Sequence, residues 1–98
     1  MILDDLRAVI ADRNRNPLPG SYVSALIARG KDEILKKVGE EAVEVIVAAK
    51  GGNRERILQE LADLWFHCMV LMHEEGLSHN DIFEELKKRS LQRRYADG

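Results

Sequence analysis

The sequence predicts an all-α protein, and three observations support this prediction. Apolar residues recur at helical spacing, as in the first segment, where they occupy positions 2, 3, 6, 9 and 10. Hydrophobic residues make up 45% of the chain but aromatic residues only 5%, and the aliphatic residues are mostly Leu, Ile, Val and Ala. This composition fits helices better than a β-sandwich or barrel. No segment has the apolar–polar alternation of a convincing strand.

Turn and cap residues place the first two helices. The first is expected from residue 1 to about residue 13, where it runs into residues 14–20, which hold both prolines of the chain. Ser21 is a suitable N-cap for a short helix over residues 22–29. Gly30 ends that helix.

Three further helices follow. The third is expected over residues 32–50, ending at Gly51 and Gly52, and the fourth over residues 54–75, capped by Asn53 and closed by Gly76. Ser78, with Asp81 at the third position after it, has the pattern of a capping box. It opens a last helix that continues to about residue 93.

The two long helices are apolar around more than one face, over residues 42–49 and 61–72. Helices of this kind are buried on several sides. A single domain of residues 1–98 has too few other helices to cover both of them. We therefore expect an antiparallel helical bundle completed by dimerisation, or a higher homo-oligomer.

Composition also excludes several partners. With 15 basic and 17 acidic residues the net charge is −2, which argues against a nucleic-acid-binding surface. The longest apolar stretch, residues 64–72, is interrupted by His67 and is too short to span a membrane. No signal peptide is visible, and the single Cys68 excludes a disulfide framework, so a cytoplasmic location is expected.

Two acidic clusters are the main candidates for a functional site. Residues three or four apart share a helix face, so Glu41 pairs with Glu44 on one helix and Glu60 with Asp63 on the next. The two pairs lie about seven residues before and after the Gly-Gly-Asn turn at residues 51–53, which is about 10 Å along each helix. Glu44 stands within the apolar run 42–49, where an ionised carboxylate is costly unless it is paired or metal-bound. If the two faces meet, four carboxylates converge: Glu41, Glu44, Glu60 and Asp63, with Glu40 beside them.

Such a cluster calls for a cation. Two like charges 4 Å apart repel by about 4 kcal/mol at an effective dielectric constant of 20. An all-oxygen ligand set favours Mg²⁺ or Mn²⁺, whereas zinc would need His or Cys ligands at a suitable spacing. The alternative, solvated helix faces with ordinary salt bridges, stays open at this point.

Longer strings extend the acidic pattern. Ser-Tyr-Val at residues 21–23 and Gly30 precede ILKKVGEEAVE at residues 34–44, and ELADLWFH follows at residues 60–67. Over nearly the whole chain these resemble the phosphoribosyl-ATP pyrophosphohydrolase family of histidine biosynthesis, within the all-α nucleoside triphosphate pyrophosphohydrolase (MazG-like) superfamily. The resemblance implies Mg²⁺-dependent hydrolysis of the α–β phosphoanhydride of N1-(5-phosphoribosyl)-ATP to N1-(5-phosphoribosyl)-AMP and pyrophosphate. A stand-alone form is expected, without the cyclohydrolase domain of bifunctional relatives.

The resemblance also implies roles for the acidic residues. Glu41, Glu44, Glu60 and Asp63 would bind Mg²⁺, with Mn²⁺ as a substitute. Glu40 would either orient water as a base or bind another ion. No Ser or Cys has an adjacent base in a recognisable pattern, so a covalent nucleophile is not expected.

Substrate contacts are predicted from cationic and aromatic residues, each with a structural alternative. Lys36 and Lys37 could bind phosphates or pair with the acids one turn later. Tyr22 could stack on adenine or simply pack. His67, on the face of Glu60 and Asp63, could support a ligand carboxylate or be a satisfied core residue. The predicted ribose-phosphate clamp lies near the end of the chain, at Arg89, Arg93 and Arg94.

Two rival functions are kept. A house-cleaning nucleoside triphosphate pyrophosphohydrolase would use the same metal site on another base. A non-enzymatic helical dimerisation module would carry the acids merely as surface charge. The Lys-Lys-Val-Gly string at residues 36–39 favours the phosphoribosyl-ATP enzyme.

Overall fold

The computed structural model describes residues 1–91, which form five α-helices and no strand. The all-α prediction is confirmed, and the predicted helix boundaries agree within two residues wherever the structure describes them. The expected continuation of the last helix to residue 93 lies outside the described part. The helices are α1 (Ile2–Arg15), α2 (Tyr22–Arg29), α3 (Lys31–Gly51), α4 (Arg54–Glu74) and α5 (His79–Leu91).

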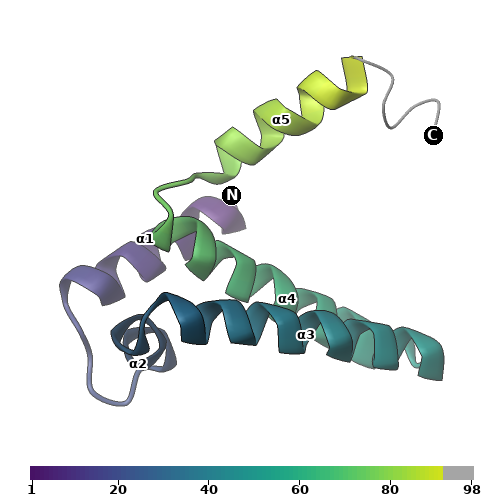
Figure 1. Ribbon diagram of the computed structural model, residues 1–98, viewed down its shortest axis with the longest axis horizontal. Coiled ribbons are helices and arrows are strands. Elements are labelled where there is room, and N and C mark those ends of the chain that lie inside the picture. Colours follow the sequence, from purple (N-terminus) through teal and green to yellow (C-terminus); the bar gives the residue numbers. More distant parts are fainter. Residues whose placement is uncertain (92–98) are drawn as a thin grey trace.

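The two long helices, α3 and α4, lie side by side as an antiparallel hairpin (Figure 1). Gly52 ends α3 in the left-handed conformation, at φ 78°, and its N–H donates to the carbonyls of Ala48 and Ala49. The Asn53 side chain then accepts a hydrogen bond of 3.1 Å from the N–H of Arg56 and caps α4. This tight turn sets the register of the two helices, and thereby the height at which their acidic residues face each other.

The hydrophobic core occupies one end of the hairpin, where α1 and α2 pack against the start of α3 and the second half of α4. Its buried side chains come from all four helices: Ile10, Leu26, Ile34, Met69 and Val70. Ile34 and Val70 have no exposed surface. The turn end of the hairpin lacks this cover, because α1 and α2 lie at the opposite end (Figure 1).

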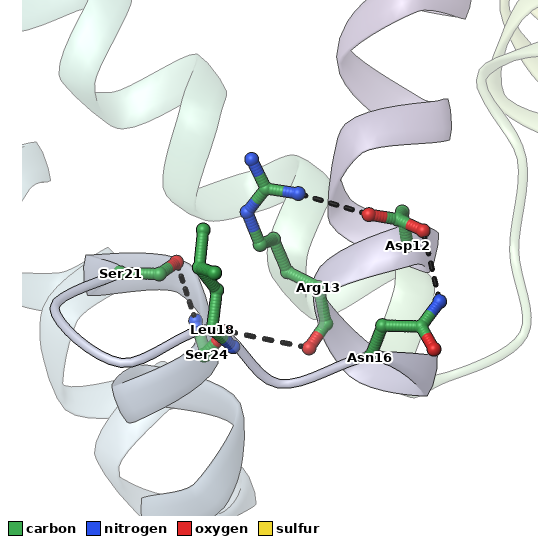
Figure 2. A network of polar contacts seen from close by, with 6 residues as sticks. All are labelled: Asp12, Arg13, Asn16, Leu18, Ser21 and Ser24. Atoms are coloured by element: carbon green, nitrogen blue, oxygen red, sulfur yellow. Dashed lines mark hydrogen bonds and ion pairs between the residues drawn. The ribbon is translucent and has the colours of Figure 1, made fainter.

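A polar network fixes α2 against α1 (Figure 2). The Ser24 hydroxyl donates to the Arg13 carbonyl at 3.3 Å and accepts from the Leu18 N–H at 3.1 Å, so it ties the proline loop to both helices. The Ser21 hydroxyl accepts from the Ser24 N–H and caps α2, as predicted. Tyr22, the first residue of α2, is therefore held in a defined position.

A large apolar surface remains exposed in the single chain. On the hairpin, Ile46 is 67% exposed and Trp65 61%, and further exposed apolar residues accompany them: Val43, Val47, Leu58 and Leu61. Helix α5 projects away from the other four (Figure 1) and exposes Phe83. Within residues 1–91 no helix is both long enough and apolar enough to cross a membrane.

Candidate functional site

Three carboxylates meet halfway along the hairpin. Oxygen atoms of Glu41 on α3 and of Glu60 and Asp63 on α4 lie within 4.8 Å of one another. The side chains of Glu41 and Glu60 are only 14% and 18% exposed, whereas Asp63 is open to solvent. The structure thus brings together three of the four carboxylates proposed from the sequence as metal ligands.

Glu44 stands apart from this group. Its side chain is 50% exposed in the single chain, so the apolar residues around it in sequence do not bury it there. It lies on the uncovered part of α3, among the exposed residues Val43, Ile46 and Val47. Arg56 lies 4.0 Å from Glu44 and 3.6 Å from Glu60, so one guanidinium links Glu44 to the edge of the cluster. Sequence reasoning missed Arg56, although its i, i+4 spacing to Glu60 was a usable signal.

Repulsion within the cluster acts on the pKa of Glu60. Burial raises the pKa of Glu60, and the negative charges of Asp63, Glu41 and Glu44 raise it further, with Arg56 opposing them. Among three oxygens bound octahedrally to Mg²⁺ at about 2.1 Å, at most one pair is trans, at about 4.2 Å, and the other pairs are about 3.0 Å apart. The three side chains would therefore have to move closer together to bind one ion directly. Hard oxygen donors, partial burial and negative charge that Lys37 and Arg56 offset only in part together fit a divalent cation.

The raised pKa gives a testable pH dependence. The raised pKa means that the folded, metal-free protein holds the Glu60 proton more tightly than the unfolded chain does. The protonated side chain therefore contributes most to stability below the ordinary carboxyl pKa of 4.5, and this contribution is lost as the pH rises through the raised pKa. The Glu60→Gln variant lacks this titration. We expect its melting temperature to exceed that of the wild-type protein at neutral pH, in chelator, and the difference to shrink as the pH falls towards 4.5. Thermal unfolding followed by circular dichroism measures it; a difference that is constant with pH would contradict the assignment.

The predicted phosphate-binding lysines are engaged in ion pairs. Lys37 lies 3.5 Å from Glu40 and 3.7 Å from Glu41, and Lys36 lies 3.9 Å from Glu40. The alternative of pairing one turn along the helix is therefore what the structure contains. The Lys36–Glu40 pair is largely exposed and therefore weak, so a phosphate group can compete for Lys36, whereas the Lys37–Glu41 pair is more covered. Glu40 itself is half-exposed beside the cluster.

His67 joins Tyr22 to the backbone of Asp63. Its Nδ1 lies 2.7 Å from the Asp63 carbonyl oxygen and its Nε2 lies 2.7 Å from the Tyr22 hydroxyl. Because a carbonyl only accepts, the contact assigns the proton to Nδ1, and Nε2 accepts from the tyrosine. His67 is thus a buried histidine with both ring nitrogens hydrogen-bonded. It contacts the backbone of Asp63 and does not contact the carboxylate of a proposed metal ligand. Tyr22 and His67 are 45 residues apart in the sequence, so no local sequence pattern predicts their contact.

Tyr22 presents a half-exposed ring beside the lysines. Its ring meets that of His67 edge to face, with centroids 5.7 Å apart, and lies 6.2 Å from that of Phe66. Burial raises the pKa of Tyr22, and nearby Lys37 opposes this. The hydroxyl is held by His67 while part of the ring face stays accessible, so both predicted roles, packing and a stacking surface, remain compatible with its position.

The predicted ribose-phosphate clamp is only partly described. Arg89 lies on α5 and pairs with Glu85 at 2.9 Å. Figure 1 shows α5 leading away from the middle of the hairpin, where the acidic cluster lies. The other two members of the predicted clamp, Arg93 and Arg94, lie outside the described residues.

The antiparallel hairpin and its half-buried carboxylate cluster place the chain in the class of all-α proteins with a site suited to cations. Comparison with known proteins makes the class specific. A family model, phosphoribosyl-ATP pyrophosphohydrolase, matches residues 3–90. The chain belongs to this family.

Relatives with the same name in several bacteria support the assignment. The chain is 46% identical over 81 residues to the phosphoribosyl-ATP pyrophosphatase of Bacillus thuringiensis (strain Al Hakam). The aligned residues cover 83% of this chain and 76% of the relative. The chain is 48% identical over 88 residues to that of Geotalea daltonii, covering 90% and 83% of the two chains. The corresponding protein of Bacillus mycoides is 43% identical over 89 residues, covering 91% and 83%. The sequence-based recognition is confirmed.

Proposed function

We propose that this chain hydrolyses the α–β phosphoanhydride of N1-(5-phosphoribosyl)-ATP, releasing pyrophosphate and N1-(5-phosphoribosyl)-AMP, in histidine biosynthesis. The proposal rests on its identity of 46–48% over most of its length to proteins named for this substrate and reaction. Its substrate is a small nucleotide, and it acts as a hydrolase. A cytoplasmic location stays a prediction from the single cysteine.

The acidic cluster would hold the metal ion of this reaction. Glu41, Glu60 and Asp63 are the proposed Mg²⁺ ligands, with Glu44 joining from the edge if Arg56 releases it. Mn²⁺ takes the same oxygen ligands and is expected to substitute. When bound, such an ion polarises phosphoryl oxygens and lowers the pKa of a bound water. The support for this proposal is the partial burial of the two glutamates and the raised pKa of Glu60.

The residues around the cluster would handle the substrate. Phosphate oxygens would draw Lys36 and Lys37 away from Glu40, because charge-assisted contacts to phosphate are stronger than exposed ion pairs. Glu40, once released, could accept a proton from water as general base; binding a further ion is its other proposed role. Tyr22 would offer its accessible ring face to adenine. Arg89 and Arg93 remain the proposed contacts of the ribose phosphate.

Direct attack by water is proposed, without a covalent intermediate. Burial raises the pKa of the Cys68 thiol, so very little thiolate is present at neutral pH. The carboxylates of the cluster are needed as metal ligands and repel an incoming phosphate in the metal-free protein. Water is therefore the nucleophile best suited to this site.

We further propose that the protein is a homodimer in which two α3–α4 hairpins form a four-helix bundle. The large apolar side chains exposed on the hairpin, including Ile46 and Trp65, would be left in water by a monomer. Facing hairpins from two subunits would bury them as in other bundles.

A substrate comparison tests the proposed activity. Pyrophosphate release in Mg²⁺ is measured for phosphoribosyl-ATP and for common NTPs and dNTPs under the same conditions. We expect kcat/KM for phosphoribosyl-ATP to exceed that for ATP by at least about a hundredfold, since a site that binds the extra ribose phosphate loses those contacts with ATP. Equal or faster turnover of dNTPs would instead identify a house-cleaning enzyme. If no nucleotide were turned over, the result would favour the alternative function, a non-enzymatic helical dimerisation module.

A further inference from the structure

Tyr22 is oriented in the reverse of the usual way for a half-exposed tyrosine. A tyrosine at a surface commonly packs its ring on the protein and leaves its polar tip in water. Here the hydroxyl lies 2.7 Å from Nε2 of His67, which is only 5% exposed, while Tyr22 as a whole is 47% exposed. The polar tip therefore points inward, and part of the apolar ring faces solvent.

The hydrogen bonds of His67 explain this orientation. Its Nδ1 lies 2.7 Å from the carbonyl oxygen of Asp63, so in a neutral ring Nδ1 carries the proton and Nε2 accepts from Tyr22. A protonated ring would keep the same contact, because a hydroxyl can accept as well as donate. Rotation of the Tyr22 side chain away from His67 would leave Nε2 buried without a partner, which is unfavourable.

Aromatic packing and the helix cap restrict Tyr22 further. The rings of Tyr22 and Phe66 both meet that of His67 edge to face, at centroid distances of 5.7 and 5.0 Å. The backbone of Tyr22 follows the Ser21 cap, whose hydroxyl accepts from the N–H of Ser24 (Figure 2). Because the backbone and the hydroxyl are both fixed, little side-chain entropy is left to lose when a ligand contacts the ring.

The exposed ring lies beside the proposed phosphate and metal sites. Burial raises the pKa of the Tyr22 hydroxyl and the charge of Lys37 lowers it, so Lys37 lies within electrostatic range. The Lys37 ammonium is 3.7 Å from a carboxylate oxygen of Glu41, one of the proposed Mg²⁺ ligands. A flat aromatic group joined to phosphates fits this arrangement, because a nucleobase stacks on an aromatic ring while its phosphates reach the cations.

We propose that His67 is a positioning residue, which holds the Tyr22 ring as a preformed stacking surface for the purine base of the nucleotide. That the ligand is this nucleotide rests on the proposed function. His67 acts through Tyr22 and not through the metal ligands, because its bond to Asp63 goes to the backbone carbonyl and not to the carboxylate. Its contribution is therefore expected in nucleotide binding and KM, with little effect on kcat.

Binding of AMP in Mg²⁺ tests this role without hydrolysis, since AMP has no phosphoanhydride. Proton NMR follows the adenine H2 and H8 resonances as the full chain is added. A base stacked on the face of the Tyr22 ring is shifted upfield by the ring current, which a general loss of stability would not produce. We expect this upfield shift with wild-type protein and its loss in Tyr22→Leu, which removes the ring.

Further variants separate the ring from its hydrogen bond. Tyr22→Phe keeps the ring but cannot donate to His67. It should weaken AMP binding and raise KM for phosphoribosyl-ATP about three- to tenfold, with kcat within about twofold and an unchanged response to Mg²⁺. His67→Asn keeps a donor near the Nδ1 position but has no acceptor at Nε2, so it should match Tyr22→Phe. The double variant should bind AMP no more weakly than either single variant.

A rescue and a control complete the test. His67→Gln restores an acceptor near the Nε2 position and should bind AMP within about twofold of wild type. His73→Asn changes another histidine of α4 and should bind AMP as wild type does. Circular dichroism checks that each variant is folded, and because Tyr22 is half-exposed, Tyr22→Phe decides the result even if a His67 variant does not fold.

Three results would overturn the role of His67. They are no upfield shift of adenine with wild-type protein, AMP binding by Tyr22→Phe as tight as that of wild type, or equal weakening by His73→Asn and His67→Asn. A wild-type protein that stacks AMP on Tyr22 but releases no pyrophosphate from phosphoribosyl-ATP would refute the proposed hydrolysis alone and would support the stacking surface.

Discussion

Replacing Glu60 by Gln is expected to abolish pyrophosphate release while making the metal-free protein more stable. Glu60 shares the cluster with Glu41 and Asp63, and its raised pKa shows that its ionised form is disfavoured there without a cation. Loss of one electrostatic contact to a reacting group costs about a hundred- to thousandfold in turnover. Removing one of three converging charges also relieves repulsion, so the melting temperature in chelator should rise.

The same variant separates a metal site from surface charge. Wild-type protein should gain thermal stability on addition of Mg²⁺, because the ion binds the folded state only, and Glu60→Gln should lose most of this gain. Glu74→Gln, an exposed replacement at the other end of α4, is the matched control and should behave as wild type in Mg²⁺. Full activity of Glu60→Gln, or an unchanged response to Mg²⁺, would show that the cluster is not the metal site.

Replacing Ile46 by Glu is expected to convert the proposed dimer to a monomer. Ile46 is 67% exposed in the single chain, so a glutamate there costs the isolated subunit little, whereas a dimer interface would bury its charge. Sedimentation velocity should show a dimer for the wild type and a monomer for the variant at the same concentration. Trp65, 61% exposed in the subunit, should emit at longer wavelength in the variant because it becomes solvated.

Ala28→Glu adds the same charge to an exposed position of α2 and is the control for Ile46→Glu. It should remain dimeric with the emission of wild type. Circular dichroism checks that both variants keep their helices. A wild-type protein that sediments as a monomer, or an Ile46→Glu variant that remains a dimer, would contradict a bundle formed through this face.

The elements that the sequence predicted well depend on local chemistry. The caps at Ser21 and Asn53 and the left-handed glycine at Gly52 act within a few residues, so helix boundaries were accurate. The facing of Glu41 with Glu60 and Asp63 followed from equal distances to one tight turn, which leaves little freedom in register.

The features that the sequence did not predict depend on how helices pack. Tyr22 and His67 are 45 residues apart, and Asp4 contacts His79 across an even longer separation. Such contacts require the rotation of each helix about its axis, which hydrophobic periodicity does not define precisely. An apolar neighbourhood in sequence implies burial only when another helix covers it, and among residues 1–91 of the single chain Glu44 stays half-exposed.

The most direct test of the central claim is pyrophosphate release from phosphoribosyl-ATP by chelator-treated wild-type protein, before and after Mg²⁺ is restored. The proposed site predicts negligible release without the ion, saturable recovery as Mg²⁺ is added, and no comparable recovery in Glu60→Gln. Equal release in chelator and in Mg²⁺, with the same rate in Glu60→Gln, would contradict a metal-dependent reaction at Glu41, Glu60 and Asp63.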